Sequence, residues 1–191
     1  VRIRSLLIRL DIIRAKAQYA YRYDCIVPPV NIQGKTRLIN SRNPVLLLHN
    51  SKRGKETVPC SLELSSSGRL LVISGPNAGG KSITLKTVGL IQCMIQSGVP
   101  VPVDPGTEIT LVEKIMGDIG DSQSIENELS TYSSRLEKMR VFLEESDDRS
   151  LLLIDEFGSG TDPDLGSALA EEVLERLHNL KVRGVITTHY N

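Results

Sequence analysis

Apolar positions near the start of the chain repeat with the period of a helix. Over residues 3–20 the apolar side chains recur at alternating intervals of three and four residues, namely Ile3, Leu6, Leu10, Ile13, Ala17 and Ala20. This pattern predicts an amphipathic helix. Its heptad spacing fits a helix that packs against another helix, and it fits equally well a helix that packs against its own domain. Pro28 and Pro29 are expected to end the helix and to begin a loop.

The next stretch, residues 31–64, holds only short apolar pieces separated by Gly, Asn, Pro and Lys. Such pieces predict a small N-terminal subsheet of short antiparallel strands, here at residues 37–39, 45–48 and 61–64. A turn is expected at residues 65–68, where serines precede a glycine.

From residue 69 onward, short apolar runs alternate with longer segments of helical pattern. The runs predict strands at residues 69–74, 109–116, 150–155 and 183–188. The segments between them predict helices at residues 81–97, 124–145 and 163–180. Alternating strands and helices are typical of a parallel sheet with helices on its faces. The predicted fold class is therefore α/β, with a mainly parallel sheet.

The composition is that of an ordinary soluble globular protein. Of the 191 residues, 40% are hydrophobic and 24% are charged, which suits one domain with a small appendage. The formal net charge is zero, so the chain lacks the excess of basic residues that is typical of a DNA-binding domain. We interpret the small basic cluster of Lys52, Arg53 and Lys55 as a solvated loop.

The cysteines point to a reducing compartment. Cys25, Cys60 and Cys93 are widely spaced and form no Cys-x-x-Cys pair, so neither a zinc site nor a disulfide framework is expected. No apolar run approaches the roughly 20 residues that span a bilayer. We therefore expect a cytoplasmic protein without a membrane partner.

A glycine-rich run between a predicted strand and a predicted helix carries the clearest candidate chemistry. It reads Gly75-Pro76-Asn77-Ala78-Gly79-Gly80-Lys81-Ser82 and fits the pattern Gly-x4-Gly-Lys-Ser/Thr. Glycines let backbone N–H groups converge on a polyphosphate, and the helix N-terminus that follows favours anions. We expect Lys81 to reach the β and γ phosphates, Ser82 to bind Mg²⁺, and Ile83 to complete the nucleotide-binding set. The alternative is a glycine-rich turn with an incidental lysine.

Two adjacent acids, Asp155 and Glu156, follow the apolar run 151–154. Strand C-termini are where α/β sheets place their sites. We expect Asp155 to hold Mg²⁺, directly or through water, and Glu156 to orient and deprotonate an attacking water. The alternative is that both acids merely begin a loop. His189, after the last predicted strand, is expected to sense the γ-phosphate or to position the water, unless it is a surface histidine.

Taken together, these motifs resemble those of the MutS family. The run 75–82 is similar to that family's phosphate-binding loop, residues 155–161 to its Asp-Glu box, and residues 187–190 to its closing histidine motif. The stretch 118–133 is similar to the MutS-two branch, which is associated with branched DNA and recombination rather than mismatch correction. The resemblance covers residues 5–191 and is densest from residue 69 onward. The chain differs from the family pattern at two places: Ser82 replaces a threonine that is common in the family, and Asn43-Pro44 replaces a frequent His-Pro.

The resemblance implies an ABC-type P-loop ATPase that uses ATP, ADP and Mg²⁺. It also implies a homodimer in which each domain completes the other's nucleotide site, with Ser124 reaching the partner's γ-phosphate and residues 158–162 lining the interface. Residues 1–27 would be the end of a lever helix, and residues 28–191 the ATPase domain, whose C-terminal part we expect beyond Asn191. DNA would be bound by domains outside this chain.

Three functions are compared on this basis. The leading hypothesis is DNA processing related to repair and recombination control, in which ATP binding closes a dimer and hydrolysis opens it. A second hypothesis is a nucleotide-gated factor that acts on ribosomes or RNA, and it would use the same catalytic residues. A third, a transport-type ABC ATPase, is disfavoured because residues 123–126 replace the Leu-Ser-Gly-Gly-Gln signature.

Overall fold

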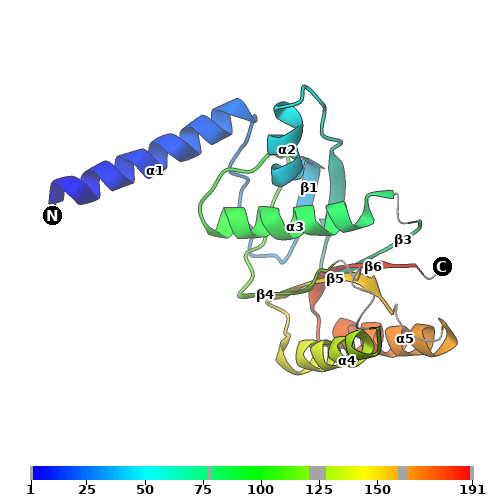
Figure 1. Cartoon of the computed structure of the whole chain (residues 1–191). Coiled ribbons are helices and arrows are strands. Elements are labelled where there is room, and N and C mark those ends of the chain that lie inside the picture. The colour runs from blue at the N-terminus through cyan, green and yellow to red at the C-terminus, as the bar shows by residue number, and fades with distance from the viewer. Residues whose placement is uncertain (1, 77–78, 121–127, 159–162, 190–191) are drawn as a thin grey trace. The chain divides into compact units, whose positions relative to one another are not determined.

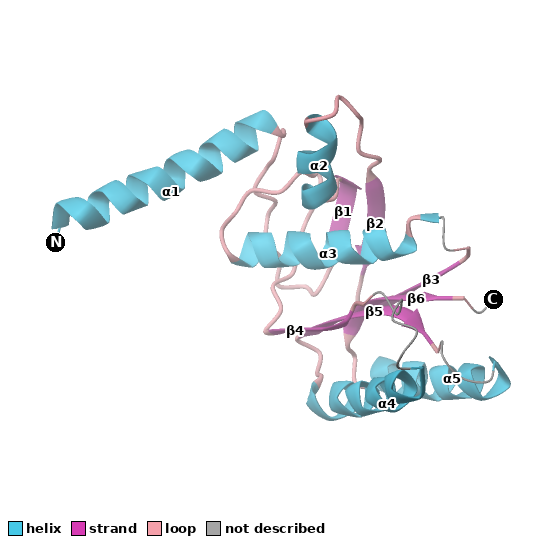
Figure 2. Ribbon diagram, viewed as in Figure 1, coloured by secondary structure: helices cyan, strands magenta, loops and turns pink. Residues whose placement is uncertain are grey.

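The computed structural model of the chain describes residues 2–76, 79–120, 128–158 and 163–189. They form an α/β fold, whose helices and strands are shown in Figure 2. Two separately compact units are present: the first contains residues 1–63 and 90–110, and the second contains residues 64–89 and 111–191. No helix within the described stretches is long and apolar enough to cross a membrane.

A four-stranded sheet organises the second unit. Its strands lie in the order β3 (Leu70–Ser74), β6 (Arg183–Thr188), β5 (Ser150–Phe157) and β4 (Lys114–Asp118). Every neighbouring pair is parallel, so the predicted parallel sheet is confirmed. The carboxyl ends of all strands therefore meet at one edge of the sheet, which is where α/β folds place their sites.

Helices cover both faces of this sheet. On one face, α4 (Glu128–Glu145) and α5 (Pro163–Asn179) lie together (Figure 1). Their apolar side chains, those of the two central strands and that of the residue just before β6 form a buried core of Met139, Phe142, Leu152, Ile154, Phe157, Ala170, Val173, Leu177, Val182 and Ile186. A sheet covered on both faces explains why the central strands are apolar runs without polar alternation.

The opposite face carries the first half of α3 (Lys81–Gln96). The contact is close at Gly89, where an added Cβ would lie only 2.5 Å from Cδ1 of Leu153 in β5. Because successive side chains of a strand point to opposite faces, Leu153 points away from the core that Leu152 and Ile154 share. Gly89 thus lets the helix approach the strand closely.

The first unit contains α1 (Arg2–Arg22), β1 (Thr36–Ser41), α2 (Pro44–Ser51) and β2 (Cys60–Leu64). The strands β1 and β2 pair in a two-stranded antiparallel sheet, which confirms the predicted N-terminal subsheet. The hydroxyl of Ser41 donates to the carbonyl of Cys60 at 2.7 Å and helps to join the two strands.

The prediction of a strand at residues 45–48 was wrong, because this run is the helix α2. Asn43 caps the helix by accepting hydrogen bonds from the N–H groups of Val45 at 3.0 Å and Leu46 at 3.1 Å. Pro44 occupies the first turn, where its missing N–H costs nothing. The pair Asn43-Pro44 is therefore a helix start signal that decided the structure of the short apolar run.

The strand predicted at residues 109–116 was placed too early. Only β4, which begins at Lys114, joins the parallel sheet. Ile109 is fully buried in the first unit, where it forms an isolated bridge with Val30. The first part of this apolar run therefore belongs to the first unit and the last part to β4. The periodicity of the sequence does not show where one ends and the other begins.

The apolar stripe of α1 is exposed. Ile3, Leu6, Leu10 and Ile13 have exposed fractions of 75%, 56%, 54% and 62%. Packing of this stripe against the chain's own domain, one of the two alternatives, is therefore not observed, and packing against another helix stays a prediction. The side chain of Lys16 links α1 to the end of α3 by donating to the carbonyls of residues 97 and 98, at 3.2 and 2.8 Å.

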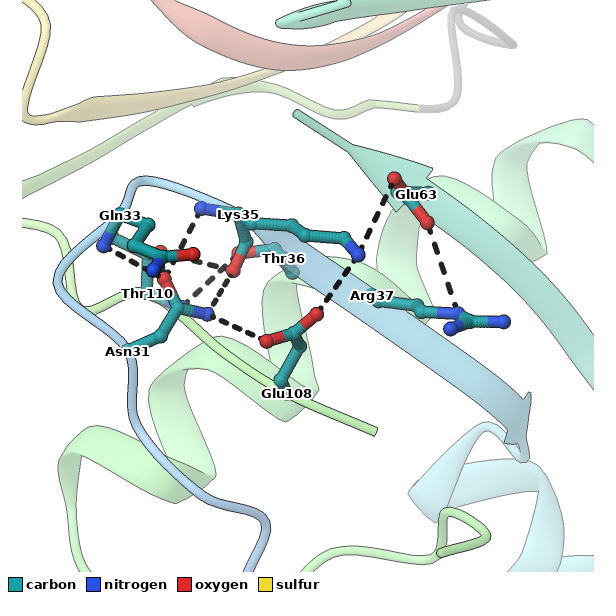
Figure 3. Close-up of polar contacts among 8 residues, drawn as sticks. All are labelled: Asn31, Gln33, Lys35, Thr36, Arg37, Glu63, Glu108 and Thr110. Carbon is teal, nitrogen blue, oxygen red and sulfur yellow. Dashed lines mark hydrogen bonds and ion pairs between the residues drawn. The ribbon is translucent and has the colours of Figure 1, made fainter. Parts of the chain in front are cut away.

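A polar cluster holds the loop before β1 (Figure 3). The side-chain oxygen of Asn31 accepts from the N–H groups of Gln33 at 3.1 Å and Lys35 at 3.2 Å. The same oxygen accepts from the hydroxyl of Thr110 at 2.9 Å. Lys35 in turn forms an ion pair with Glu108 at 3.0 Å. The asparagine thus satisfies loop backbone groups that no strand pairs.

Candidate functional site

Three segments singled out from the sequence meet at the carboxyl edge of the parallel sheet. The glycine-rich turn begins at Gly75, directly after β3, while Asp155 and Glu156 lie near the end of β5. His189 follows β6, which lies between β3 and β5. The order of the strands, rather than the order along the chain, therefore brings the turn and the acids together.

A side-chain hydrogen bond connects the turn to the acids. The hydroxyl of Ser82, in the first turn of α3, donates to Oδ1 of Asp155 at 3.0 Å. The carboxylate of Asp155 is nearly buried, with an exposed fraction of 8% for the residue. A buried carboxylate needs polar partners, and Ser82 supplies one of them from a segment 73 residues away.

The backbone of the turn is open on its outer side. Gly75 and Gly80 have φ values of 137° and 79°, which favour glycine. Gly79 has no such φ, and no described atom lies within 4 Å of a Cβ built on it. Nothing in the described chain therefore requires glycine at residue 79, which leaves room for another group to approach the backbone. Asn77 and Ala78 lie outside the described residues.

A buried ammonium group lies in the same turn. Lys81 is only 6% exposed, and its Nζ donates to the carbonyl of Gly75 across the turn. The N-terminus of α3 adds a partial positive charge at this place. Both features favour a bound anion. Ile83, the next residue after Ser82, has an exposed fraction of 41%.

The acids lie in a bulge of β5. Ile154 pairs with Ile186, and Phe157 pairs with Thr188. Between these pairs β5 has two residues, Asp155 and Glu156, whereas β6 has only Thr187. Bulges of this kind redirect side chains and often lie beside sites.

Thr187 holds both acids through one hydroxyl. Its oxygen accepts a hydrogen bond from the N–H of Glu156 at 2.8 Å and donates one to Oδ1 of Asp155 at 2.5 Å. Thr187 is completely buried. Sequence reasoning included this residue in a motif but gave it no role, because the bulge register that brings the hydroxyl to both acids is not visible in the sequence.

The backbone of Glu156 is strained. Its φ of 52° lies in the left-handed region, which costs a non-glycine residue roughly 1–2 kcal/mol. Strained residues of this kind cluster at functional sites. The Glu156 carboxylate lies 3.7 Å from Nε2 of His189, and both side chains are partly exposed.

A cavity of about 30 Å³ adjoins the acids on the side of α4 and α5. Its lining includes Asp155, Glu156 and Phe157, together with Asp118 and Arg135. A cavity of this size exceeds the ~10–15 Å³ needed to hold one water molecule. Water therefore has room directly beside the two carboxylates.

Two further predictions fall wholly or mostly outside the described residues. Ser124 is not described, and of the stretch 158–162 only Gly158 is described. Their predicted roles at a dimer interface stay predictions.

Comparison with known proteins agrees with the motifs. Residues 71–191 match the family model of MutS domain V. The chain is 44% identical over 187 residues to endonuclease MutS2 of Ruminiclostridium cellulolyticum, which covers 98% of this chain and 23% of that protein. It is 43% identical to endonuclease MutS2 of Acetivibrio thermocellus, with the same coverage. The Clostridium botulinum protein of that name is 42% identical over 95% of this chain and 22% of its own length. The chain thus spans less than a quarter of these relatives.

Proposed function

This chain belongs to the MutS family, in its MutS2 branch, and from that premise we propose that it is a P-loop ATPase domain that hydrolyses ATP with Mg²⁺. The observation that carries the proposal is the 3.0 Å hydrogen bond between Ser82 and Asp155. It joins the start of the helix after the glycine-rich turn to the acidic end of a buried strand. Triphosphate binding and water activation require these two segments to lie side by side.

The turn would bind the triphosphate. Its glycine backbone offers N–H groups, and the open space at Gly79 supports close approach of an oxygen-rich anion. Lys81 would leave the carbonyl of Gly75 and donate to the β and γ phosphates. Pro76 and Ile83, at the two ends of the turn, would complete the nucleotide-binding set.

The donor set fits magnesium. Mg²⁺ binds oxygen at 2.0–2.1 Å in an octahedron, so two neighbouring ligands lie about 2.9 Å apart. The Ser82 hydroxyl and the Asp155 carboxylate are separated by 3.0 Å, which is the spacing that one ion requires of two ligands. When bound, the ion would neutralise charge that develops on the phosphate oxygens.

Glu156 would act as the general base. Its carboxylate would accept a proton from water as the water oxygen bonds to the γ-phosphorus and the bond to the β,γ-bridging oxygen breaks, which yields ADP and phosphate. His189, at 3.7 Å from Glu156, would orient that carboxylate or the γ-phosphate.

The test is the variant Glu156→Gln. It should keep ATP affinity and lower kcat by about 10²–10⁴-fold, the usual contribution of a general base. Glu175→Gln is the matched control, because Glu175 is an exposed acid on α5. Normal turnover by Glu156→Gln would show that another residue activates the water. Absence of ATP hydrolysis by the wild-type protein would refute the proposed function.

We further propose that the complete protein acts on DNA as a homodimer, through segments outside this chain. The relatives are named endonucleases, and the exposed apolar stripe of α1 supports a lever helix that packs against another helix. ATP would favour the closed dimer and hydrolysis would release it, with Ser124 completing the partner's site. Sedimentation of Glu156→Gln with ATP should show a dimer, and a monomer under those conditions would contradict composite sites.

Stimulation of the ATPase separates the two candidate partners. Branched DNA should raise kcat of the complete protein more than linear duplex does. Stimulation by ribosomes but not by branched DNA would instead favour the function on ribosomes or RNA.

A further inference from the structure

We propose that Thr187 is the positioning residue of this site: its hydroxyl holds the bulge in β5 that keeps Glu156 out of the core, and it holds in place the Asp155 carboxylate that also accepts from Ser82. The inference rests on the proposed ATPase function. It adds a third group, on a different strand, to the pair of acids that the sequence motif contains.

The bulge decides where each side chain of β5 points. Ile154 faces the core beneath α4 and α5, and side chains alternate along a regular strand. Without the bulge, Asp155 would face α3 and Glu156 would point into that core. With the bulge, Phe157 occupies the core position instead and is 5% exposed. The side chain of Glu156 then no longer has to point into the core.

One hydroxyl maintains this arrangement. Glu156 has a left-handed backbone conformation, and its N–H donates a hydrogen bond to the hydroxyl oxygen of Thr187. The same hydroxyl donates a hydrogen bond to Oδ1 of Asp155. This oxygen also accepts a hydrogen bond from the hydroxyl of Ser82. A β-branched side chain has few χ1 rotamers, so a completely buried threonine presents this hydroxyl in a fixed direction.

The contacts predict which kinetic constants depend on Thr187. Its hydroxyl bonds to the two acids, and no hydrogen bond joins it to the described residues of the glycine-rich turn, so nucleotide affinity should not depend on it. Its loss should release Glu156, which lowers kcat, and free the Asp155 carboxylate to rotate, which raises the Mg²⁺ concentration for half-maximal rate.

The experiment compares Thr187→Val with Thr187→Ser in the complete protein. Valine keeps the shape and removes the hydroxyl, whereas serine keeps the hydroxyl. We expect Thr187→Val to lower kcat at least about tenfold, equivalent to ~1.4 kcal/mol in the barrier. Its KM for ATP should change less than about threefold, while its Mg²⁺ requirement rises. Thr187→Ser should retain most of kcat.

Thr107→Val is the matched control. Thr107 is also completely buried, and its hydroxyl also accepts from a backbone N–H, that of Ile39 at 3.0 Å, but it lies in the first unit. This variant should keep kcat within about twofold. Nucleotide affinity and circular dichroism confirm that each variant is folded.

Three results would overturn the inference: wild-type kcat in Thr187→Val, an equal loss in Thr187→Ser, or an equal loss in Thr107→Val. Failure of the proposed function is distinguishable, because then the wild-type protein would not hydrolyse ATP. If Glu156→Gln abolishes turnover and Thr187→Val does not, only the role of Thr187 is wrong.

Discussion

Replacement of Gly89 by alanine tests how closely α3 must approach β5. The added Cβ would lie 2.5 Å from Cδ1 of Leu153, whereas carbon atoms in contact are about 3.5–4.0 Å apart. The helix or the leucine must therefore move by about 1 Å. Leu153 is 3% exposed, so neighbouring side chains must move with it.

Two opposing effects set the magnitude. Overpacking of a buried site costs roughly 1–3 kcal/mol. Alanine is a better helix former than glycine by about 0.8–1.0 kcal/mol. We expect Gly89→Ala to destabilise the protein by about 1 kcal/mol net, with the clash exceeding the gain in helix propensity.

A double-mutant cycle with Leu153→Ala separates these effects. Leu153→Ala alone should cost about 2–5 kcal/mol, but it removes the atom that the new Cβ meets. In that background Gly89→Ala should stabilise by about 1 kcal/mol, because only the propensity remains. Urea unfolding followed by circular dichroism gives the free energy of unfolding for all four proteins.

The decisive result is a change of sign in the effect of Gly89→Ala on the free energy of unfolding: it should be destabilising with Leu153 present and stabilising in the Leu153→Ala background. If Gly89→Ala stabilises the protein as much with Leu153 present as in the Leu153→Ala background, α3 does not approach β5 as closely at Gly89 as described. The packing also affects the site, because Gly89 lies about two helical turns after Ser82. A helix displaced from β5 would lengthen the bond from Ser82 to Asp155, so Gly89→Ala should also raise the Mg²⁺ requirement of ATP hydrolysis.

Further predictions concern the metal site, a helix cap and a thiol. Ser82→Ala should raise the Mg²⁺ concentration for half-maximal ATPase rate at least about tenfold, and Ser82→Thr should restore it; an unchanged requirement would exclude Ser82 as a ligand. Asn43→Ala should lower the free energy of unfolding by about 1 kcal/mol through loss of the α2 cap, while Asn43→Asp, which keeps the acceptor, should lower it less in the same denaturation assay. Burial raises the pKa of the Cys25 thiol, so its reactive thiolate fraction is reduced at pH 8. Mass spectrometry should show slower alkylation by iodoacetamide at Cys25 than at the exposed Cys93, with the difference shrinking as pH rises; equal rates at pH 8 would contradict this.

The parallel sheet could be predicted because its two central strands are buried on both faces. Such strands are apolar runs, and helices separate them in the sequence. The short run 45–48 was misassigned because four apolar residues fit a strand or a helix equally well. The cap signal of Asn43 and Pro44 was present and would have decided it.

The candidate site was predicted where it consists of local motifs and missed where it depends on packing. The glycine-rich turn and the two acids are contiguous in sequence, so their chemistry can be identified there. The role of Thr187 depends on a one-residue bulge in a neighbouring strand, and Gly89 matters only because Leu153 lies opposite it. Neither relation leaves a periodic pattern in the sequence.

A crystal structure of the Glu156→Gln variant with ATP and Mg²⁺ tests the central claim most directly. We expect phosphates within the turn of Gly75–Ser82, and one metal ion bound to the Ser82 hydroxyl with the Asp155 carboxylate beside it or one water away. We also expect a water between the residue at position 156 and the γ-phosphorus. Nucleotide bound elsewhere, or a metal ion remote from both oxygens, would contradict it.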